Sequence, residues 1–145
     1  MDRNPDLLYV PPSLVSVMRF RSVEHDGERL GARLRGSDVR LILAIWSAWS
    51  YIHPAPQGMT AITVQQSFLA HHLGRIHKDR LEASISRLLG TDVWDGERWI
   101  PVLTDCYAQP GTPVRPGVPV GDDWIFDVGP DMASALGRGF FNQQR

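Results

Sequence analysis

Several features that would point to a membrane or to an oxidising compartment are missing from this chain. Cysteine occurs once, at Cys106, so no internal disulfide can form, and this is typical of proteins from a reducing cytoplasm. No apolar run reaches the roughly 18 residues that a bilayer span requires. Residues 1–10 lack the basic region and apolar core of a secretory signal. We therefore expect a cytoplasmic protein that does not enter membranes.

Groups that carry catalysis or hold metals are equally scarce. His71 and His72 are adjacent, so on a helix their side chains point about 100° apart and do not chelate together. His77 is not at helical chelating spacing from His71, and no cysteine or carboxylate cluster joins the histidines. Cys106 has no base close to it in sequence and is interpreted as a small core residue. No glycine-rich phosphate-binding loop is present. The sequence thus predicts neither an enzyme nor a protein with a metal or a cofactor.

Lysine is also nearly absent. Of the 15 basic residues only Lys78 is a lysine. Arginine suits phosphate and guanine, because its planar fork donates two parallel hydrogen bonds. The formal net charge is −1, whereas domains that bind nucleic acid are commonly basic, so DNA binding requires the charges to be segregated. The acidic residues do cluster in sequence, at Asp92, Asp95 and Glu97 and again at Asp122, Asp123 and Asp127.

What is present is enough for one globular domain. The chain has 145 residues, of which 43% are hydrophobic, and can bury a sizeable core. The pattern of residues divides it into an N-terminal arm (1–16), a folded domain (17–137) and a C-terminal tail (138–145). Strand patterns and helix patterns both occur in the domain, so we expect an α+β fold.

Residues 17–35 predict a β-hairpin with its turn at His25, Asp26 and Gly27. A three-residue loop, with Gly27 in the left-handed conformation, sorts apolar and basic side chains onto opposite faces, whereas a two-residue loop mixes them. The basic face then carries Arg19, Arg21, Arg29 and Arg33. Two interpretations remain open: these arginines form a solvated surface, or they contact phosphates or a partner protein.

A strongly apolar helix is expected over residues 38–52, with Ser37 as its N-cap and Asp38 placed to interact with the helix dipole. Apolar side chains surround nearly the whole helix, which indicates a central position in the core. Trp46 and Trp49 fall on its main apolar stripe, so core packing explains them better than base stacking does.

Residues 60–90 predict a helix-turn-helix, the unit that places its second helix in the DNA major groove. After a short strand, Thr63 and Gln66 have the spacing of a capping box for a helix that starts at Val64. Gly74 then permits a left-handed turn, which a bulkier residue would strain.

The second helix, expected from about His77 to Leu89, has an apolar and a polar side. Leu81, Ile85 and Leu88 lie on the apolar side and face the core. The polar side is interpreted as a surface that reads base edges. Its members are Arg80, Ala83, Ser84 and Arg87. The cations near the start of the helix, which suit backbone phosphates, are Arg75 and Lys78. The alternative is a helix face that is merely solvated.

Two strands joined by a long loop follow this helix and are expected to form a wing. The first strand is predicted at residues 99–107 and the second at 123–128. The loop between them has a proline at every third position, which favours an extended polyproline-like segment. Arg115, in the middle of the loop, is a candidate for contact with the minor groove or with phosphate. A short helix over residues 131–136 closes the domain.

The segment LAHHLG (residues 69–74), followed by Ile85 and Leu88, resembles the winged-helix pattern of bacterial DNA-binding proteins. The order of the parts, through RWIPVL to DWIFDVGPDMASAL, is similar to the winged-helix domains of plasmid replication initiators. This resemblance implies binding of a monomer to repeated origin sequences, a homodimer in the inactive state, and contacts with host replication proteins. The chain departs from the family in being short, since many initiators carry two such domains, and in lacking strong positive charge.

We therefore expect a winged helix-turn-helix with an N-terminal hairpin and a two-stranded wing, which binds double-stranded DNA and initiates plasmid replication. Two alternatives remain open. One is a winged-helix transcriptional repressor. The other is a winged-helix module that binds protein instead of DNA, and the near-neutral net charge favours it.

Overall fold

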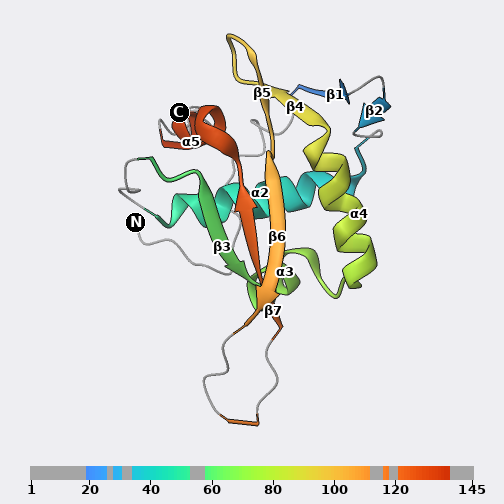
Figure 1. Cartoon of the computed structure of the whole chain (residues 1–145), viewed down its shortest axis with the longest axis vertical. Helices are drawn as coiled ribbons and strands as arrows, with labels where there is room; N and C mark the ends of the chain where they lie inside the picture. Colours follow the sequence, from blue (N-terminus) through green and yellow to red (C-terminus); the bar gives the residue numbers. More distant parts are fainter. Residues whose placement is uncertain are drawn as a thin grey trace.

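The computed structural model describes residues 19–25, 28–30, 34–52, 58–111, 116–117 and 121–137. Within these ranges the chain is an α+β protein, as predicted, with two antiparallel sheets of strand order β2-β1-β4-β5 and β3-β7-β6 (Figure 1). The elements in chain order are β1 (Phe20–His25), β2 (Glu28–Leu30), α2 (Gly36–Ser50), β3 (Ala61–Gln65), α3 (Gln66–Leu73), α4 (Lys78–Leu89), β4 (Thr91–Trp94), β5 (Trp99–Pro101), β6 (Asp105–Pro110), β7 (Asp122–Asp127) and α5 (Gly129–Gly137).

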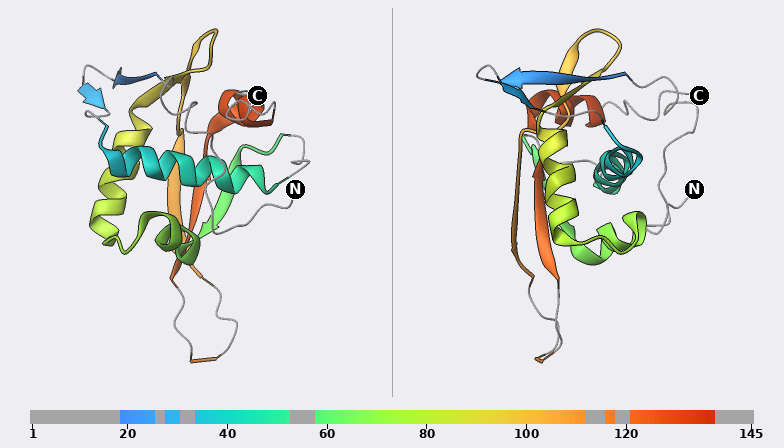
Figure 2. Two further views of the ribbon diagram at one scale, coloured as in Figure 1. Left: turned by 180° about the vertical axis from the view of Figure 1, so that it is seen from behind. Right: turned by 90° about the vertical axis from the view of Figure 1, so that its right-hand side faces the viewer.

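Helix α2 is the centre of the core, as its apolar pattern predicts. It crosses one face of the β3-β7-β6 sheet and packs against α3, α4, α5 and β3 (Figures 1 and 2). Trp46 and Trp49 are both buried, so their interpretation as core residues is confirmed. The predicted cap is wrong: Ser37 is exposed and lies inside the helix, and the N-cap residue is Arg35. The Arg35 N–H donates to Asp38 Oδ2 at 2.8 Å, so the aspartate satisfies an amide at the helix start.

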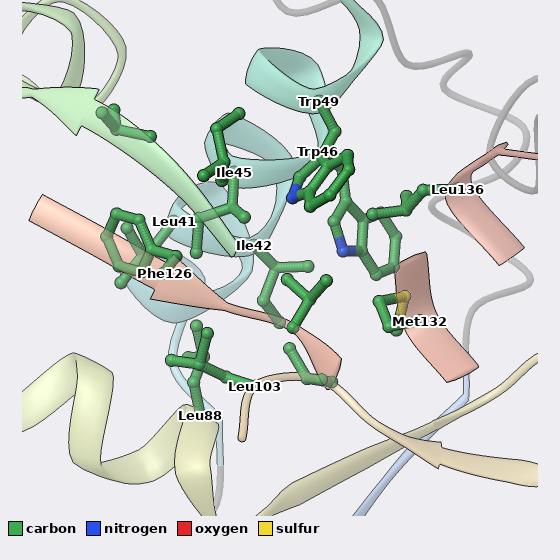
Figure 3. Close-up of a cluster of buried hydrophobic side chains, with 14 of the residues drawn as sticks. Leu41, Ile42, Ile45, Trp46, Trp49, Leu88, Leu103, Phe126, Met132 and Leu136 are labelled. Carbon is green, nitrogen blue, oxygen red and sulfur yellow. The ribbon is translucent and has the colours of Figure 1, made fainter. Parts of the chain in front are cut away.

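The β3-β7-β6 sheet covers α2 with one apolar face. Ile62 of β3 and Cys106 of β6 both pair with Phe126 of β7, and Phe126 is fully buried. Figure 3 shows the side chains of α2 lying between Phe126 on one side and Met132 and Leu136 of α5 on the other. Burial of each such side chain stabilises the fold by about 1.5–3 kcal/mol, so this cluster is what fixes α2 against the sheet.

The N-terminal hairpin forms, but its predicted register is wrong. His25 pairs with Glu28, so the connection has two residues, 26 and 27, instead of three. The prediction assumed that both strands pack one common face against the core. Instead β1 is an inner strand, because its second edge pairs with β4 and sets Phe20 opposite the buried Val93. The core therefore fixes the faces of β1, while β2 is an edge strand with a weaker constraint on its register.

The predicted capping box is also wrong, because Thr63 and Val64 belong to strand β3 and not to a helix. Thr63 pairs with Ile125 and Val64 with Trp124. The burial of Val64 against the core outweighs the local capping pattern, and α3 begins only at Gln66. The Gln66 side chain has another partner: Trp124 Nε1 donates to Gln66 Oε1 at 2.8 Å. This bond joins the start of α3 to β7.

The two helices of the predicted helix-turn-helix are present. Helix α3 ends at Leu73 and α4 begins at Lys78, so residues 74–77 form the connection. Gly74 has φ of +75° and ψ of −170°, so the expected positive φ, which favours glycine, is present, although the residue is not in the left-handed helical conformation. Helix α4 ends at Leu89, as predicted, and its N-cap residue is His77.

The strand predicted over residues 99–107 is split between the two sheets. Strand β5 pairs with β4, whereas β6 pairs with β7. Val102 and Leu103, at the crossing, are both buried, which a regular strand with one exposed face does not allow. A turn at Asp95 joins β4 to β5, and the Asp95 Oδ1 accepts hydrogen bonds from the N–H groups of Glu97 and Arg98.

The closing helix α5 forms where it is predicted, with Pro130 in its first turn. It packs against α2 and β5. Among the helices that the structure describes, none combines the length and apolarity that a membrane span needs. The predicted N-terminal arm and C-terminal tail lie outside the described residues.

Candidate nucleic-acid interface

Helix α4 has one side in the core and one side in solvent. Leu81, Ile85 and Leu88 are buried, as predicted from their spacing. On the opposite side Arg80 and Ala83 are exposed. The other exposed residues of the helix are Lys78, Asp79, Glu82, Ser86 and Leu89. Arg80 and Ala83 are neighbours on the helix surface because they are three residues apart. They form the part of the predicted DNA-reading surface that is open to a ligand.

Ser84 and Arg87 do not belong to that open surface, which corrects the prediction. Ser84 is 2% exposed, and its Oγ donates to Asp38 Oδ1 at 2.5 Å. Arg87 donates from Nε to Asp38 Oδ2 at 2.7 Å and from Nη2 to Asp38 Oδ1 at 2.8 Å. The first turn of α2 lies along this flank of α4 and occupies both side chains. They hold the two helices together and are not free to read bases.

The Asp38 carboxylate is fully buried, and both of its oxygens accept hydrogen bonds. Burial acts to raise its pKa, but the hydrogen bonds from Arg87, from Ser84 and from the Arg35 N–H outweigh burial and lower the pKa below the ordinary 3.8. The hydrogen bond to Asp38 in turn raises the pKa of Arg87. The group is therefore ionised at neutral pH, and it joins α2 to α4 through a charge-assisted, two-point contact. We call this group the Asp38 clamp.

Lys78 lies at the start of α4, where the prediction expected a phosphate-contacting cation. Its side chain is 62% exposed, and its Nζ lies 4.0 Å from Glu82 and 3.7 Å from Asp122. Asp122 is the first residue of β7 and pairs with Pro110 at the end of β6, so this ion pair joins α4 to the loop end of the β6-β7 hairpin. Exposed pairs of this kind contribute about 0–1 kcal/mol, so a phosphate can compete for the lysine.

Arg75 and Arg80 are both exposed, and within the described residues neither has an ion-pair partner. Arg75 lies in the turn between α3 and α4. The charged residues on the exposed side of α4 are Lys78 and Arg80 against Asp79 and Glu82, which sum to zero. Arg75 adds one positive charge. The cations therefore gather at the start of α4, although the exposed side of the helix is neutral as a whole.

The outer face of the β3-β7-β6 sheet has the opposite character. By register, Asp127 pairs with Asp105 and Asp123 with Gln65 and Gln109, so the three aspartates share a face. This is the face opposite to the buried Phe126. DNA binding by a chain of near-neutral net charge requires acidic and basic residues to lie on different surfaces. This requirement is met in part, because the acidic face points away from α2 and the core, and phosphate would avoid it.

Arg19 and Arg21 lie on the other sheet, away from the start of α4. Arg19 is exposed, while Arg21 pairs with Asp92 at 3.1 Å and lies over the Trp99 ring at 4.6 Å. In Figure 1, β1 lies at one end of the molecule and the turn between α3 and α4 lies toward the other. The structure thus does not bring these two arginines together with Arg75 and Lys78. Arg33 and Arg115, also predicted to contact DNA, lie outside the described residues.

Sequence reasoning missed three contacts: two at the start and flank of α4, made by Asp122 and Asp38, and one on the other sheet, made by Trp99. Asp38 is 46 and 49 residues from its partners on α4, and Asp122 is 44 residues from Lys78 (122 minus 78), so no local pattern reveals either contact. Trp99 carried no functional interpretation, although it and Arg21 are in contact. Within the described ranges no three histidine, cysteine, aspartate or glutamate side chains gather as metal ligands.

Comparisons with protein-family models, with curated protein sequences and with solved structures give no match for this chain. The geometry of its own residues is therefore the basis for a functional proposal.

Proposed function

We propose that this chain is a winged-helix domain that binds double-stranded DNA with α4 in the major groove. The order of its parts supports the proposal. A buried helix (α2) and a strand (β3) precede two helices joined through residues 74–77 (α3 and α4), and a hairpin (β6 and β7) follows. Its second strand pairs with β3, so the hairpin is anchored beside the helices as a wing.

One observation carries this proposal: the exposed side of α4 places a small residue beside an arginine that has no ion-pair partner among the described residues. Ala83 leaves room for close approach to a groove, and Arg80 beside it can donate two hydrogen bonds to guanine. Lys78 lies two residues before Arg80 and Arg75 lies in the preceding turn, and both suit the flanking phosphates. Ser86 is exposed three residues beyond Ala83 and can supply the hydroxyl group for base contact that was expected of Ser84.

Selection of bound sequences from a random pool of duplex DNA tests this proposal. A winged helix that reads bases enriches a common motif, and its affinity falls steeply as salt rises, because bound phosphates release counterions. Recovery of no enriched motif, together with no binding at about 50 mM salt, would contradict duplex recognition.

Replication initiation is the finer proposal, and it rests on the resemblance to plasmid initiators. Under this proposal the chain binds repeated origin sequences, forms a homodimer when inactive and contacts host replication proteins. The selected motif separates initiation from the repressor alternative. A direct repeat favours an initiator, whereas a palindrome favours a dimeric repressor, because a two-fold symmetric dimer binds symmetric half-sites.

A second candidate function is a protein-interaction module without DNA binding. The neutral charge sum on the exposed side of α4 favours it, since Asp79 and Glu82 repel phosphates. Leu89, which is 40% exposed at the end of the same helix, also suits a protein partner. The DNA selection described above decides between the two candidates.

A further inference from the structure

The outer face of the β2-β1-β4-β5 sheet carries two tryptophans and two arginines. Arg21 pairs with Asp92, and Trp94 pairs with Trp99 across β4 and β5. Because alternate residues of a strand point to opposite faces, Arg19 lies on the same face as these four side chains. We call the surface formed by Arg19, Arg21, Asp92, Trp94 and Trp99 the Trp–Arg face.

The opposite face of this sheet belongs to the core. Val93 and Ile100, the residues next to the two tryptophans, are fully buried. Trp94 and Trp99 themselves are only half-buried, whereas Trp46, Trp49 and Trp124 are at most 5% exposed. The Trp–Arg face therefore presents aromatic surface that the described part of the chain does not cover.

The side chains of the Trp–Arg face are held in place. The rings of Trp94 and Trp99 meet edge to face, with centroids 5.4 Å apart. Arg21 lies over Trp99 at 4.6 Å and is tied to Asp92 by a hydrogen bond of 3.2 Å from Nε and an ion pair of 3.1 Å from Nη2. Arg21 is still 51% exposed, so one planar cation is positioned beside the indoles without being buried.

Arg19 adds a free cation to this arrangement. It is exposed and, within the described residues, has no ion-pair partner. It lies two residues from Arg21, about 6.8 Å along an extended strand. Arg19 and Arg21 against Asp92 give the face one net positive charge. A ligand that suits this face is therefore anionic and has flat groups to stack on indole.

We propose that the Trp–Arg face binds single-stranded nucleic acid. Unpaired bases stack on aromatic rings and on arginine guanidinium planes, while arginines contact the sugar-phosphate chain. A duplex does not offer this contact, because its base faces are stacked inside the helix. This binding goes beyond the proposed recognition of duplex DNA by α4.

The position of the face allows both activities in one chain. In Figure 1, β4 and β5 lie toward the end of the molecule opposite to the start of β7. Figure 2 shows the same separation from two other directions. The start of α4 and the start of β7, which Lys78 and Asp122 join, are thus remote from the Trp–Arg face. A duplex on α4 and a single strand on the sheet do not compete for the same residues.

Intrinsic tryptophan fluorescence of the full chain tests the proposal. The probes are an oligothymidylate and an oligouridylate of about 15 nucleotides, a length within the usual site size of single-strand binders. Either oligomer is expected to quench the fluorescence saturably, with an affinity that falls as salt rises. A blunt duplex of equal length is expected to give no such quenching through this face. Absence of saturable quenching by both single strands at about 50 mM salt overturns the proposal.

Matched variants locate the binding. Trp94→Ala is expected to weaken single-strand binding by at least about 5-fold, since it removes a stacking partner. Arg19→Ala tests the same face without touching a packed ring, and is expected to weaken binding and to reduce the salt slope by about 1. Tyr107→Ala, which removes an aromatic side chain that is 54% exposed on the other sheet, is the control and is expected to change nothing.

The outcomes are separable from those of duplex binding. Equal losses in Trp94→Ala, Arg19→Ala and Tyr107→Ala would mean that the single strand binds elsewhere, and the proposal then fails. Arg80→Ala is expected to leave single-strand affinity unchanged. If the chain binds no duplex but shows the expected quenching pattern, the result contradicts duplex recognition by α4 and supports single-strand binding by the Trp–Arg face. If Arg80→Ala abolishes single-strand binding, the strand lies on α4 and this inference is wrong.

Discussion

Arg87 and Asp38 form a two-point ion pair that joins the last turn of α4 to the first turn of α2, with N–O distances of 2.7 and 2.8 Å. Ser84 donates to the same carboxylate, one turn earlier on α4. The clamp sets how α4 lies against the central helix, and so which side of α4 faces solvent. It positions the proposed recognition helix, and its side chains are occupied by contacts within the protein.

Asp38→Asn is expected to lower the free energy of unfolding by about 3 kcal/mol, because it leaves Arg87 without its charged partner in a largely buried setting. Urea denaturation measures this loss. The matched control is Asp131→Asn, which breaks the pair between Asp131 and Arg98 on the surface, where both side chains are about half exposed. The control is expected to cost less than about 1 kcal/mol. Equal costs for the two variants would show that the clamp adds no special stability.

The stability that the clamp provides is expected to disappear in acid. Because the folded-state pKa of Asp38 lies below the ordinary 3.8, the contribution is fully present above that pH and is lost as the pH falls through the lowered pKa. The difference between the wild-type chain and Asp38→Asn should thus be constant near neutrality and should shrink below about pH 3.8. A urea-midpoint series against pH measures the difference. If the difference in stability between the wild type and Asp38→Asn already disappears near pH 6, the pKa of Asp38 is raised and not lowered.

Periodicity was sufficient to predict which residues of α2 and α4 lie in the core, because their spacing fixes the apolar side of each helix. It could not predict which helix would lie along the flank of α4. A helical projection gives the angle of Arg87 around its own axis, but the partner Asp38 is 49 residues away in sequence. The two most useful corrections, Ser84 and Arg87, both arise from this long-range contact.

The errors in the strands have a related cause. Thr63 and Gln66 match a local capping pattern, yet pairing with β7 and burial of Val64 decide the structure of that segment. Likewise the alternation of apolar and basic residues over residues 17–35 could not reveal that β1 also pairs with β4. Local patterns compete with partners that are distant in sequence, and at these sites the distant partner determines the outcome.

Gly129→Ala is expected to destabilise the fold by about 2 kcal/mol. Gly129 has φ of +80°, and an added Cβ would lie 2.8 Å from Thr104 Cγ2. The control is Gly36→Ala at the start of α2, where no atom lies within 4 Å of an added Cβ and φ is not positive. The control should be neutral or slightly stabilising. Thermal denaturation compares the two variants with the wild type. A Gly129→Ala variant as stable as the wild type would contradict the positive φ of Gly129 and its close approach to Thr104 between β7 and α5.

Cys106 is expected to be a poor nucleophile in the folded chain. Burial, and then the charge of Asp105, raise the pKa of its thiol to about 12, so very little thiolate exists at neutral pH. Alkylation by iodoacetamide at about pH 8 should be at least roughly 100-fold slower in the native chain than in the denatured chain. Mass spectrometry follows the modification with time. Similar rates in the two states would show that the thiol is accessible and ionisable.

The most direct test of duplex recognition by α4 is the ratio of affinity for a selected DNA site to affinity for random duplex, measured for the wild type, Arg80→Ala and Arg98→Ala. Arg98→Ala removes the same charge from a side chain that is 57% exposed in the β4-β5 hairpin, far from the start of α4. We predict that Arg80→Ala loses about 1–3 kcal/mol of specific binding and much of the specificity ratio, while Arg98→Ala keeps both. Equal, small effects of the two substitutions, or no difference between selected and random DNA for the wild type, would contradict the account.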